Sequence, residues 1–273
     1  MVKKSRSKLK KAAPKAGGKP LSTAPRPAPK AASSVPRLER RSVLRKHLDG
    51  RLRALHQRAM LIEAQLQKLD DNRFYRVCIF GSARTRPDTQ AYNDVVTLAR
   101  MLSWEGIDIL TGGGPGLMEA ANKGAKLGQQ EKHTKSLSIG ISIQLDTEVK
   151  PNKHLDINRH HYRFSSRLDD FMRLSHAMIV TPGGIGTILE LFFSWQLVQR
   201  HHLSKRPIVL LGRKFWQGLL EWVRNNPLAA GMMDPPDFDF IHLADSPEEV
   251  CRVISKDHLD FRNNSLKRER KNG

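Results

Sequence analysis

The sequence has few cysteines, few aromatic residues and no long apolar run. Two of its 273 residues are cysteine, which excludes a disulfide scaffold and a cysteine-based metal centre. Cys78 and Cys251 lie in apolar stretches typical of buried thiols in a reducing compartment. No stretch approaches the roughly 20 apolar residues that span a bilayer, and the N-terminus lacks the apolar region of a secretory signal. We therefore expect a cytoplasmic protein that does not bind membranes.

Acidic residues are scarce at both ends of the chain and ordinary in its middle. The whole sequence carries 47 basic and 27 acidic residues, but residues 77–262 hold 22 basic and 21 acidic ones. Residues 1–36 contain ten basic residues and no acid. Attraction to polyanions should therefore belong to the tails, where we expect weak nucleic-acid binding without specific readout by the neutral body.

Composition divides the chain into four segments. Residues 1–36 lack a repeating apolar residue and are expected to be a disordered basic tail, and residues 263–273 a basic C-terminal tail. Residues 37–72 predict an amphipathic helix, because apolar residues recur there at three-four spacing: Leu52, Leu55, Ala59, Ile62, Leu66 and Leu69. That stripe could pack on the following domain, residues 73–262, or on a second copy of the helix.

From Arg76 onward, short apolar runs alternate with helical patterns, which is typical of βαβ units. The expected strands are 77–80, 107–110, 137–143, 177–180 and 208–211, and the expected helices are 91–104, 117–127, 166–174, 187–198 and 215–224. The predicted fold is α/β, a Rossmann-like doubly wound parallel sheet with helices on both faces. Residues 226–245 are expected to form a lid or an interface loop.

Three of these strands are followed by loops of small residues. The loops begin at Gly81-Ser82, at Gly112 and at Pro182, and two of them run into helical patterns. In such a sheet, ligands bind beyond the carboxyl ends of the strands, and glycine amides at a helix N-terminus bind phosphate. The loops lack the spacing of a dinucleotide fingerprint and the Gly-Lys-Ser/Thr ending of a P-loop, which disfavours nicotinamide and nucleoside-triphosphatase chemistry.

Two of the loops carry motifs. The sequence GGGPGLMEAANKGA begins at Gly112, and PGGIGTILE runs from Pro182 to Glu190. Together they resemble the "lonely guy" family of phosphoribohydrolases, whose members were formerly labelled lysine decarboxylases. The resemblance spans about residues 75–225 and departs from the family pattern at Leu168, where the family usually has lysine, and at Leu189, where it usually has an acid.

The resemblance implies hydrolysis of the N-glycosidic bond of nucleoside 5′-monophosphates, such as AMP or cytokinin nucleotides, to free base and ribose 5-phosphate. It places the catalytic roles on Glu190 and Arg167, which lies fifteen residues before Pro182. Glycosidic cleavage passes through an oxocarbenium-like state that a carboxylate stabilises, which agrees with a role for Glu190. The other expected substrate-binding residues are Gly81, Ser82, Gly113, Gly114, Glu119, Gly183, Gly184, Gly186 and Thr187.

Other functions remain open on the sequence alone. A nucleotide sensor or carrier of the same fold would bind the ligand without cleaving it, although such a protein has no evident need for Glu190. The resemblance also implies a homodimer or higher homo-oligomer. We expect no metal and no cofactor, since adjacent histidines such as His160-His161 do not face one ion.

Overall fold

The computed structural model describes residues 37–69, 74–143 and 150–272, so the predicted disordered tail lies outside the described residues. The chain divides into two compact units, Met1–Leu69 and Asp70–Gly273. No helix among the described residues is both long enough and apolar enough to cross a membrane.

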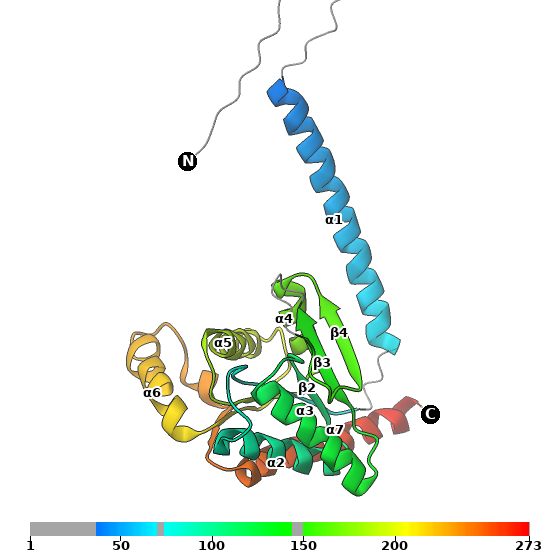
Figure 1. Cartoon of the computed structure of the whole chain (residues 1–273). Coiled ribbons are helices and arrows are strands. Elements are labelled where there is room, and N and C mark those ends of the chain that lie inside the picture. Colours follow the sequence, from blue (N-terminus) through cyan, green and yellow to red (C-terminus); the bar gives the residue numbers. More distant parts are fainter. Residues whose placement is uncertain (1–36, 70–73, 144–149, 273) are drawn as a thin grey trace, which may run out of the picture. The chain divides into compact units, whose positions relative to one another are not determined.

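A seven-stranded sheet forms the centre of the second unit (Figure 1). Its strand order is β4-β3-β2-β1-β5-β6-β7, and every pair is parallel. The strands are β1 (Arg76–Phe80), β2 (Asp108–Thr111), β3 (Ser138–Ile143), β4 (Ile157–His161), β5 (Ala177–Val180), β6 (Ile208–Leu211) and β7 (Ile241–Ala244). The order reverses at β1, which pairs with both β2 and β5.

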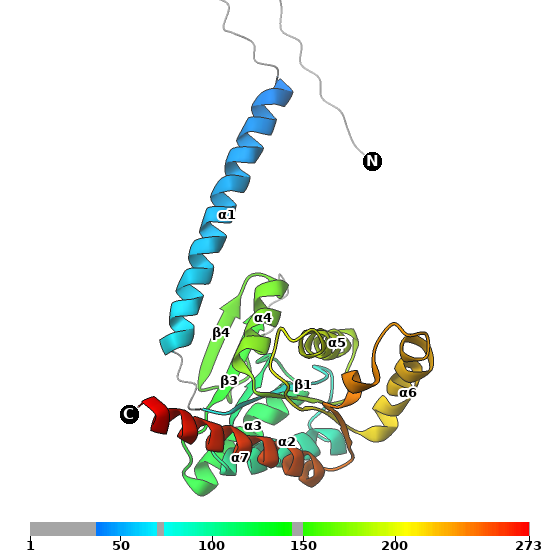
Figure 2. The same ribbon diagram turned by 180° about the vertical axis from the view of Figure 1, so that it is seen from behind.

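Helices cover both faces of the sheet (Figures 1 and 2). They are α2 (Gln90–Trp104), α3 (Leu117–Lys132), α4 (Phe164–Leu174), α5 (Ile185–Gln199), α6 (Arg213–Val223) and α7 (Pro247–Asn272), with short turns η1 (Arg224–Leu228) and η2 (Pro235–Phe238). Because strand side chains alternate between faces, Val77 and Ile79 pack with α2, α3 and α7, whereas Cys78 and Phe80 pack with α4, α5 and α6. The predicted doubly wound parallel sheet is confirmed.

The two edge strands are missing from the sequence prediction. β4 has the sequence INRHH, without an apolar run, and its side chains are partly or fully exposed. β7 lies within residues 226–245, where a loop was expected. An edge strand needs less apolar surface than a central one, which removes the signal that marks β1, β2 and β5.

The two terminal helices differ in how they are packed. α7 packs beside α2 (Figure 2) and continues to Asn272, through the segment where a basic tail was expected. In the first unit, α1 (Arg37–Leu69) is one continuous helix, and its Leu44, Leu48, Leu52 and Leu55 are more than half exposed. Docking of this helix on the domain and association with a second copy both stay predictions.

Candidate active site

Three strand ends meet at the carboxyl edge of the sheet, because β1 lies between β2 and β5. The loop after β1 is tied to both neighbouring loops. The Ser82 N–H donates to the Pro182 carbonyl at 3.2 Å, and the Leu117 N–H donates to the Ser82 carbonyl at 2.9 Å. The Thr181 hydroxyl also donates to the Phe80 carbonyl at 2.8 Å. These bonds fix the three loops relative to one another.

Glycine is required where these loops approach most closely. A Cβ atom on Gly81 would collide with the side chains of Thr181 and Leu117. Gly116 has a φ of 70°, and a Cβ atom there would collide with the Ser82 main chain. The glycines therefore let the first helix turn after β2 sit directly against the β1 loop.

A cavity of about 570 Å³ opens between the loops. It is lined by residues 79–84 and 184–187, together with Gly112, Met118, Arg167 and Glu190. The volume is in the range of ordinary small-molecule sites, which are about 300–1,000 Å³. The two residues expected to be catalytic thus lie in the same cavity, although they are 23 positions apart in the sequence.

The N-terminus of α5 forms one wall of this cavity. The first helical bond of α5 runs from the Ile188 N–H to the Gly184 carbonyl at 3.0 Å, so the preceding amides of residues 185–187 lie ahead of the hydrogen-bond ladder. Thr187 is buried, and its side chain lies against Gly183, where a Cβ atom would collide with it. Free amides and the helix dipole make this wall suitable for an anion such as phosphate.

Arg167 reaches the cavity from α4 and is held on several sides. Its Nε donates to the Ile141 carbonyl at 2.7 Å, and its guanidinium lies 5.1 Å from the centroid of the Phe171 ring. A Cβ atom on Gly112 would collide with its Nη2, so the loop after β2 contacts the guanidinium on another side. Burial lowers the pKa of Arg167 and nearby Glu190 opposes that effect, and the guanidinium keeps its charge at neutral pH.

Glu190 lies one helical turn beyond Thr187 on α5. Burial raises the pKa of its carboxyl to about 7, and the charge of Arg167 limits that rise. The carboxyl therefore exchanges a proton near neutral pH, which suits a general acid or base.

Four of the expected binding residues lie outside the cavity lining: Gly113, Gly114, Glu119 and Gly183. Gly113 has a φ of 73° and turns the loop away, so that it is buried near Gly140 and Leu155. The Gly114 carbonyl accepts a hydrogen bond from Asn152, and Glu119 has its Oε1 4.0 Å from His154 Nε2. From this loop and the start of α3, Gly112 and Met118 line the cavity instead.

The adjacent histidines of β4 serve separate contacts. The His160 ring lies 2.9 Å from the Ser142 hydroxyl, and His161 Nε2 lies 3.1 Å from an Asp170 carboxylate oxygen on the other face of the sheet. Within the described ranges, no three His, Cys, Asp or Glu residues gather as a metal centre would require.

A family model described as "possible lysine decarboxylase" matches residues 118–254, which is half of the chain. The chain belongs to this family. The prediction of "lonely guy" family membership is thereby confirmed, and the matched range includes Arg167 and Glu190.

Curated relatives of this chain include the pyrimidine/purine nucleotide 5′-monophosphate nucleosidases of Escherichia coli K12 and O157:H7. Each is 32% identical over 119 residues, which is 40% of this chain and 25% of the relative. The chain thus matches about a quarter of the length of these curated relatives.

Solved structures share the fold at low identity. A structural-genomics protein, TM1055, has a TM-score of 0.51 and 22% identity, covering 67% of this chain and 99% of the other. The molybdenum cofactor binding protein of Rippkaea orientalis has a TM-score of 0.49 and 22% identity, covering 67% and 96%. At this identity the likeness concerns the fold.

Proposed function

We propose that this family member is a nucleoside 5′-monophosphate phosphoribohydrolase that acts on AMP or a cytokinin-type nucleotide. The observation that carries the proposal is Glu190, a partly buried carboxyl with a pKa raised to about 7, which shares a cavity of about 570 Å³ with the Arg167 guanidinium. The relationship to nucleotide 5′-monophosphate nucleosidases supports the same class of reaction.

Substrate orientation follows from the wall formed by α5. A 5′-phosphate bound at the amides of residues 185–187, with the Thr187 hydroxyl as a further donor, would bring the attached ribose within reach of Glu190, about one helical turn further along. The base would then lie toward the part of the cavity lined by Gly112 and Met118.

The reaction replaces one bond at C1′ of the ribose. Water adds its oxygen to C1′, and the bond from C1′ to the base nitrogen breaks with its electron pair leaving on the base. In its ionised form Glu190 accepts the proton of the water and stabilises the positive charge that develops on the ribose ring. The base takes up a proton as it leaves, and ribose 5-phosphate remains. Arg167 neutralises the phosphate or the charge that develops on the leaving base.

The decarboxylase in the family description has less support at this cavity. Decarboxylation of an amino acid by pyridoxal phosphate needs a lysine that forms a Schiff base. Lysine does not occur among the residues that line the cavity, all of which belong to the described part of the chain. A carboxyl and a guanidinium are groups that suit hydrolysis of a phosphorylated glycoside.

The test is to incubate the full chain with a panel of nucleoside 5′-monophosphates and to follow free base by chromatography. Glu190→Gln and Arg167→Ala should abolish base release, and Glu221→Gln on the exposed side of α6 should leave it unchanged. Absence of release at enzyme concentrations equal to the substrate, with nucleotides still raising the melting temperature, would contradict the proposal and indicate a sensor or carrier.

A further inference from the structure

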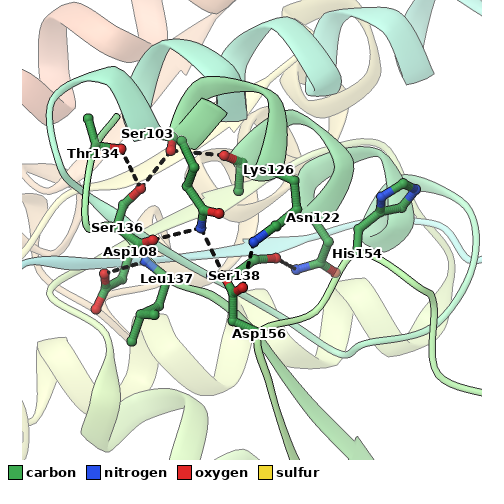
Figure 3. Close-up of polar contacts among 12 residues, drawn as sticks. Ser103, Asp108, Asn122, Lys126, Thr134, Ser136, Leu137, Ser138, His154 and Asp156 are labelled. Carbon is green, nitrogen blue, oxygen red and sulfur yellow. Dashed lines mark hydrogen bonds and ion pairs between the residues drawn. The ribbon is translucent and has the colours of Figure 1, made fainter. Parts of the chain in front are cut away.

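A buried polar network joins the loop after β2 to α3 and β3, and Figure 3 shows the part of it that includes Asn122 and Ser138. At its centre is Asn122 on α3, whose side chain is fully buried. Its Oδ1 accepts from the Thr111 hydroxyl at 2.7 Å, and its Nδ2 donates to the Ser138 hydroxyl at 2.9 Å. The Thr111 hydroxyl in turn accepts from the Gly113 N–H at 2.9 Å. The network therefore joins α3 and β3 to the loop after β2.

Asn152 connects this network to the carbonyl groups of the loop after β2. Its backbone N–H donates to the Gly113 carbonyl at 2.8 Å, and its Nδ2 donates to the Gly114 carbonyl at 3.0 Å and to Asn122 Oδ1 at 2.9 Å. Its Oδ1 accepts from the His154 N–H at 3.0 Å. One asparagine thus binds two consecutive loop carbonyls and leaves both of its own amide atoms paired.

The segment that carries Asn152, residues 151–156, is itself anchored. Leu155 lies against Gly113 and Gly140, and a Cβ atom on Gly140 would collide with its side chain. Asp156 accepts from Lys126 at 2.5 Å and from Gln129 at 2.9 Å, and its Oδ2 also accepts from the Ser138 N–H at 2.9 Å (Figure 3). Residues 151–156, to which the loop after β2 is hydrogen-bonded, are therefore themselves bonded to α3 and β3.

The held loop touches Arg167. Gly112 lies so close to the Arg167 guanidinium that a Cβ atom there would collide with Nη2. The other sides of the guanidinium are set by the Ile141 carbonyl and the Phe171 ring. A shift of the loop would open the side formed by Gly112 and let the guanidinium move away from Glu190.

We propose that Asn152 is a positioning residue of the active site: by binding the carbonyls of Gly113 and Gly114, it holds Gly112 against Arg167 and so keeps the guanidinium beside Glu190. The inference rests on the proposed function for its kinetic consequence, but its structural consequence is measurable without turnover. Stability alone does not require these amides, since replacing both partners of a hydrogen bond by apolar groups of the same shape can be nearly neutral.

The first test is kinetic. In Asn152→Ala and Asn152→Asp, we expect kcat for base release to fall about 10- to 100-fold, because misplacement of a catalytic group by about 1 Å has that effect. The aspartate should be the more harmful, since its carboxylate would face the Gly114 carbonyl and Asn122 Oδ1 without a donor. KM for the nucleotide should change less than about threefold, because the α5 wall is untouched. Thr111→Val, which weakens the loop from its other side, should act in the same direction.

The matched control is Ser103→Ala. The Ser103 hydroxyl is buried and makes two hydrogen bonds, to the Ala125 carbonyl at 3.0 Å and with the Ser136 hydroxyl at 2.6 Å, and neither partner belongs to the loop after β2 or to residues 151–156. Its variant should lower the melting temperature about as much as Asn152→Ala and leave kcat within about twofold of the wild type.

The second test does not depend on turnover. Glutamate side chains labelled with ¹³C at the carboxyl carbon can be titrated by NMR, and the Glu190 signal is the one that Glu190→Gln removes. Arg167 lowers the pKa of Glu190, so Asn152→Ala should move this titration to higher pH, whereas Ser103→Ala should not. A wild type that releases no base, together with this displacement, overturns the proposed function and keeps the positioning role. An unchanged titration and unchanged kcat, with a lower melting temperature, overturns the positioning role.

Discussion

At the amino-terminal edge of the sheet, Tyr75 is buried and its neighbours His176 and Arg206 are partly buried, as Arg167 and Glu190 are at the carboxyl-terminal edge. The contacts of the two groups differ. His176 Nδ1 accepts from the Arg76 N–H at 3.1 Å, the Tyr75 hydroxyl donates to Asp257 at 2.5 Å, and Arg206 donates to the Met172 carbonyl at 3.1 Å. Arg206 and Asp257 line a cavity of about 470 Å³ at this edge, as Arg167 and Glu190 line the cavity at the other, but the Asp257 carboxylate accepts a hydrogen bond from Tyr75.

Burial has opposite consequences at the two edges. It lowers the pKa of His176 to about 4 and raises the pKa of Tyr75, so both groups stay neutral over the physiological range. It raises the pKa of Glu190 to about 7, which is where its charge changes. Burial therefore keeps the His176 imidazole and the Tyr75 phenol in one protonation state, whereas it brings the pKa of the Glu190 carboxyl into the physiological range. Chemistry is therefore expected at the edge where the pKa of a cavity-lining acid is raised to about 7.

The largest effect is expected when the Glu190 carboxyl is replaced. Glu190→Gln keeps the shape of the side chain but cannot exchange a proton, so turnover should fall about a thousandfold or more. The limb of the pH–rate profile near pH 7 should disappear in the residual activity. The measurement is kcat for base release from pH 5.5 to 8.5. Retention of that limb in the variant would show that another group titrates there.

The next effect removes the neighbouring cation. Arg167→Met keeps much of the apolar contact with Phe171 but deletes the charge that lowers the pKa of Glu190. We expect turnover to fall about a hundredfold and the limb near pH 7 to move to higher pH. Arg213→Met, which breaks an exposed pair with Asp245, is the control and should change neither quantity. A limb that stays in place would mean that the two side chains do not interact in solution.

The sequence predicts some of these positions and not others, for identifiable reasons. Glu190 and Thr187 follow from a strand, a glycine loop and a helix that are contiguous in the chain. Gly112 and Met118 in the cavity could not be placed, because the loop direction depends on the positive φ of Gly113 and on Asn152. Asn152 lies 38 residues from the carbonyl that it binds, and no local pattern signals such a contact. The fold was more accessible because buried central strands carry their own apolar signal.

A smaller effect concerns how the free energy of unfolding depends on pH. The folded pKa of Glu190 is above its ordinary value of 4.5, so its contribution to stability is complete below pH 4.5 and is lost as pH rises through about 7. The loss is expected to reach about 3 kcal/mol. Glu190→Gln should therefore be more stable than the wild type at pH 8 and equal to it near pH 4, as measured by urea unfolding.

The amino edge should show the opposite dependence. The folded pKa of His176 is about 4, below its ordinary value of 6.5, so its contribution to stability is complete above pH 6.5 and is lost as pH falls through about 4. The loss should again reach about 3 kcal/mol. His176→Gln retains an acceptor for the Arg76 N–H and should reduce this acid sensitivity. If both variants altered the same side of the pH–stability curve, the contrast between the edges would be wrong.

The smallest expected effect tests whether the amino edge has a role beyond structure. Tyr75→Phe removes the donor to the half-buried carboxylate of Asp257 and keeps the ring that stacks on His176 at 5.2 Å. The free energy of unfolding should fall by about 1–2 kcal/mol, because the carboxylate loses a hydrogen bond in a partly buried setting. The kcat and its pH profile should stay unchanged, since Tyr75 lies at the end of β1 opposite the cavity. Activity that fell while the stability stayed intact would mean that the hydrogen bond of Tyr75 at the amino edge affects Glu190 at the other end of the sheet.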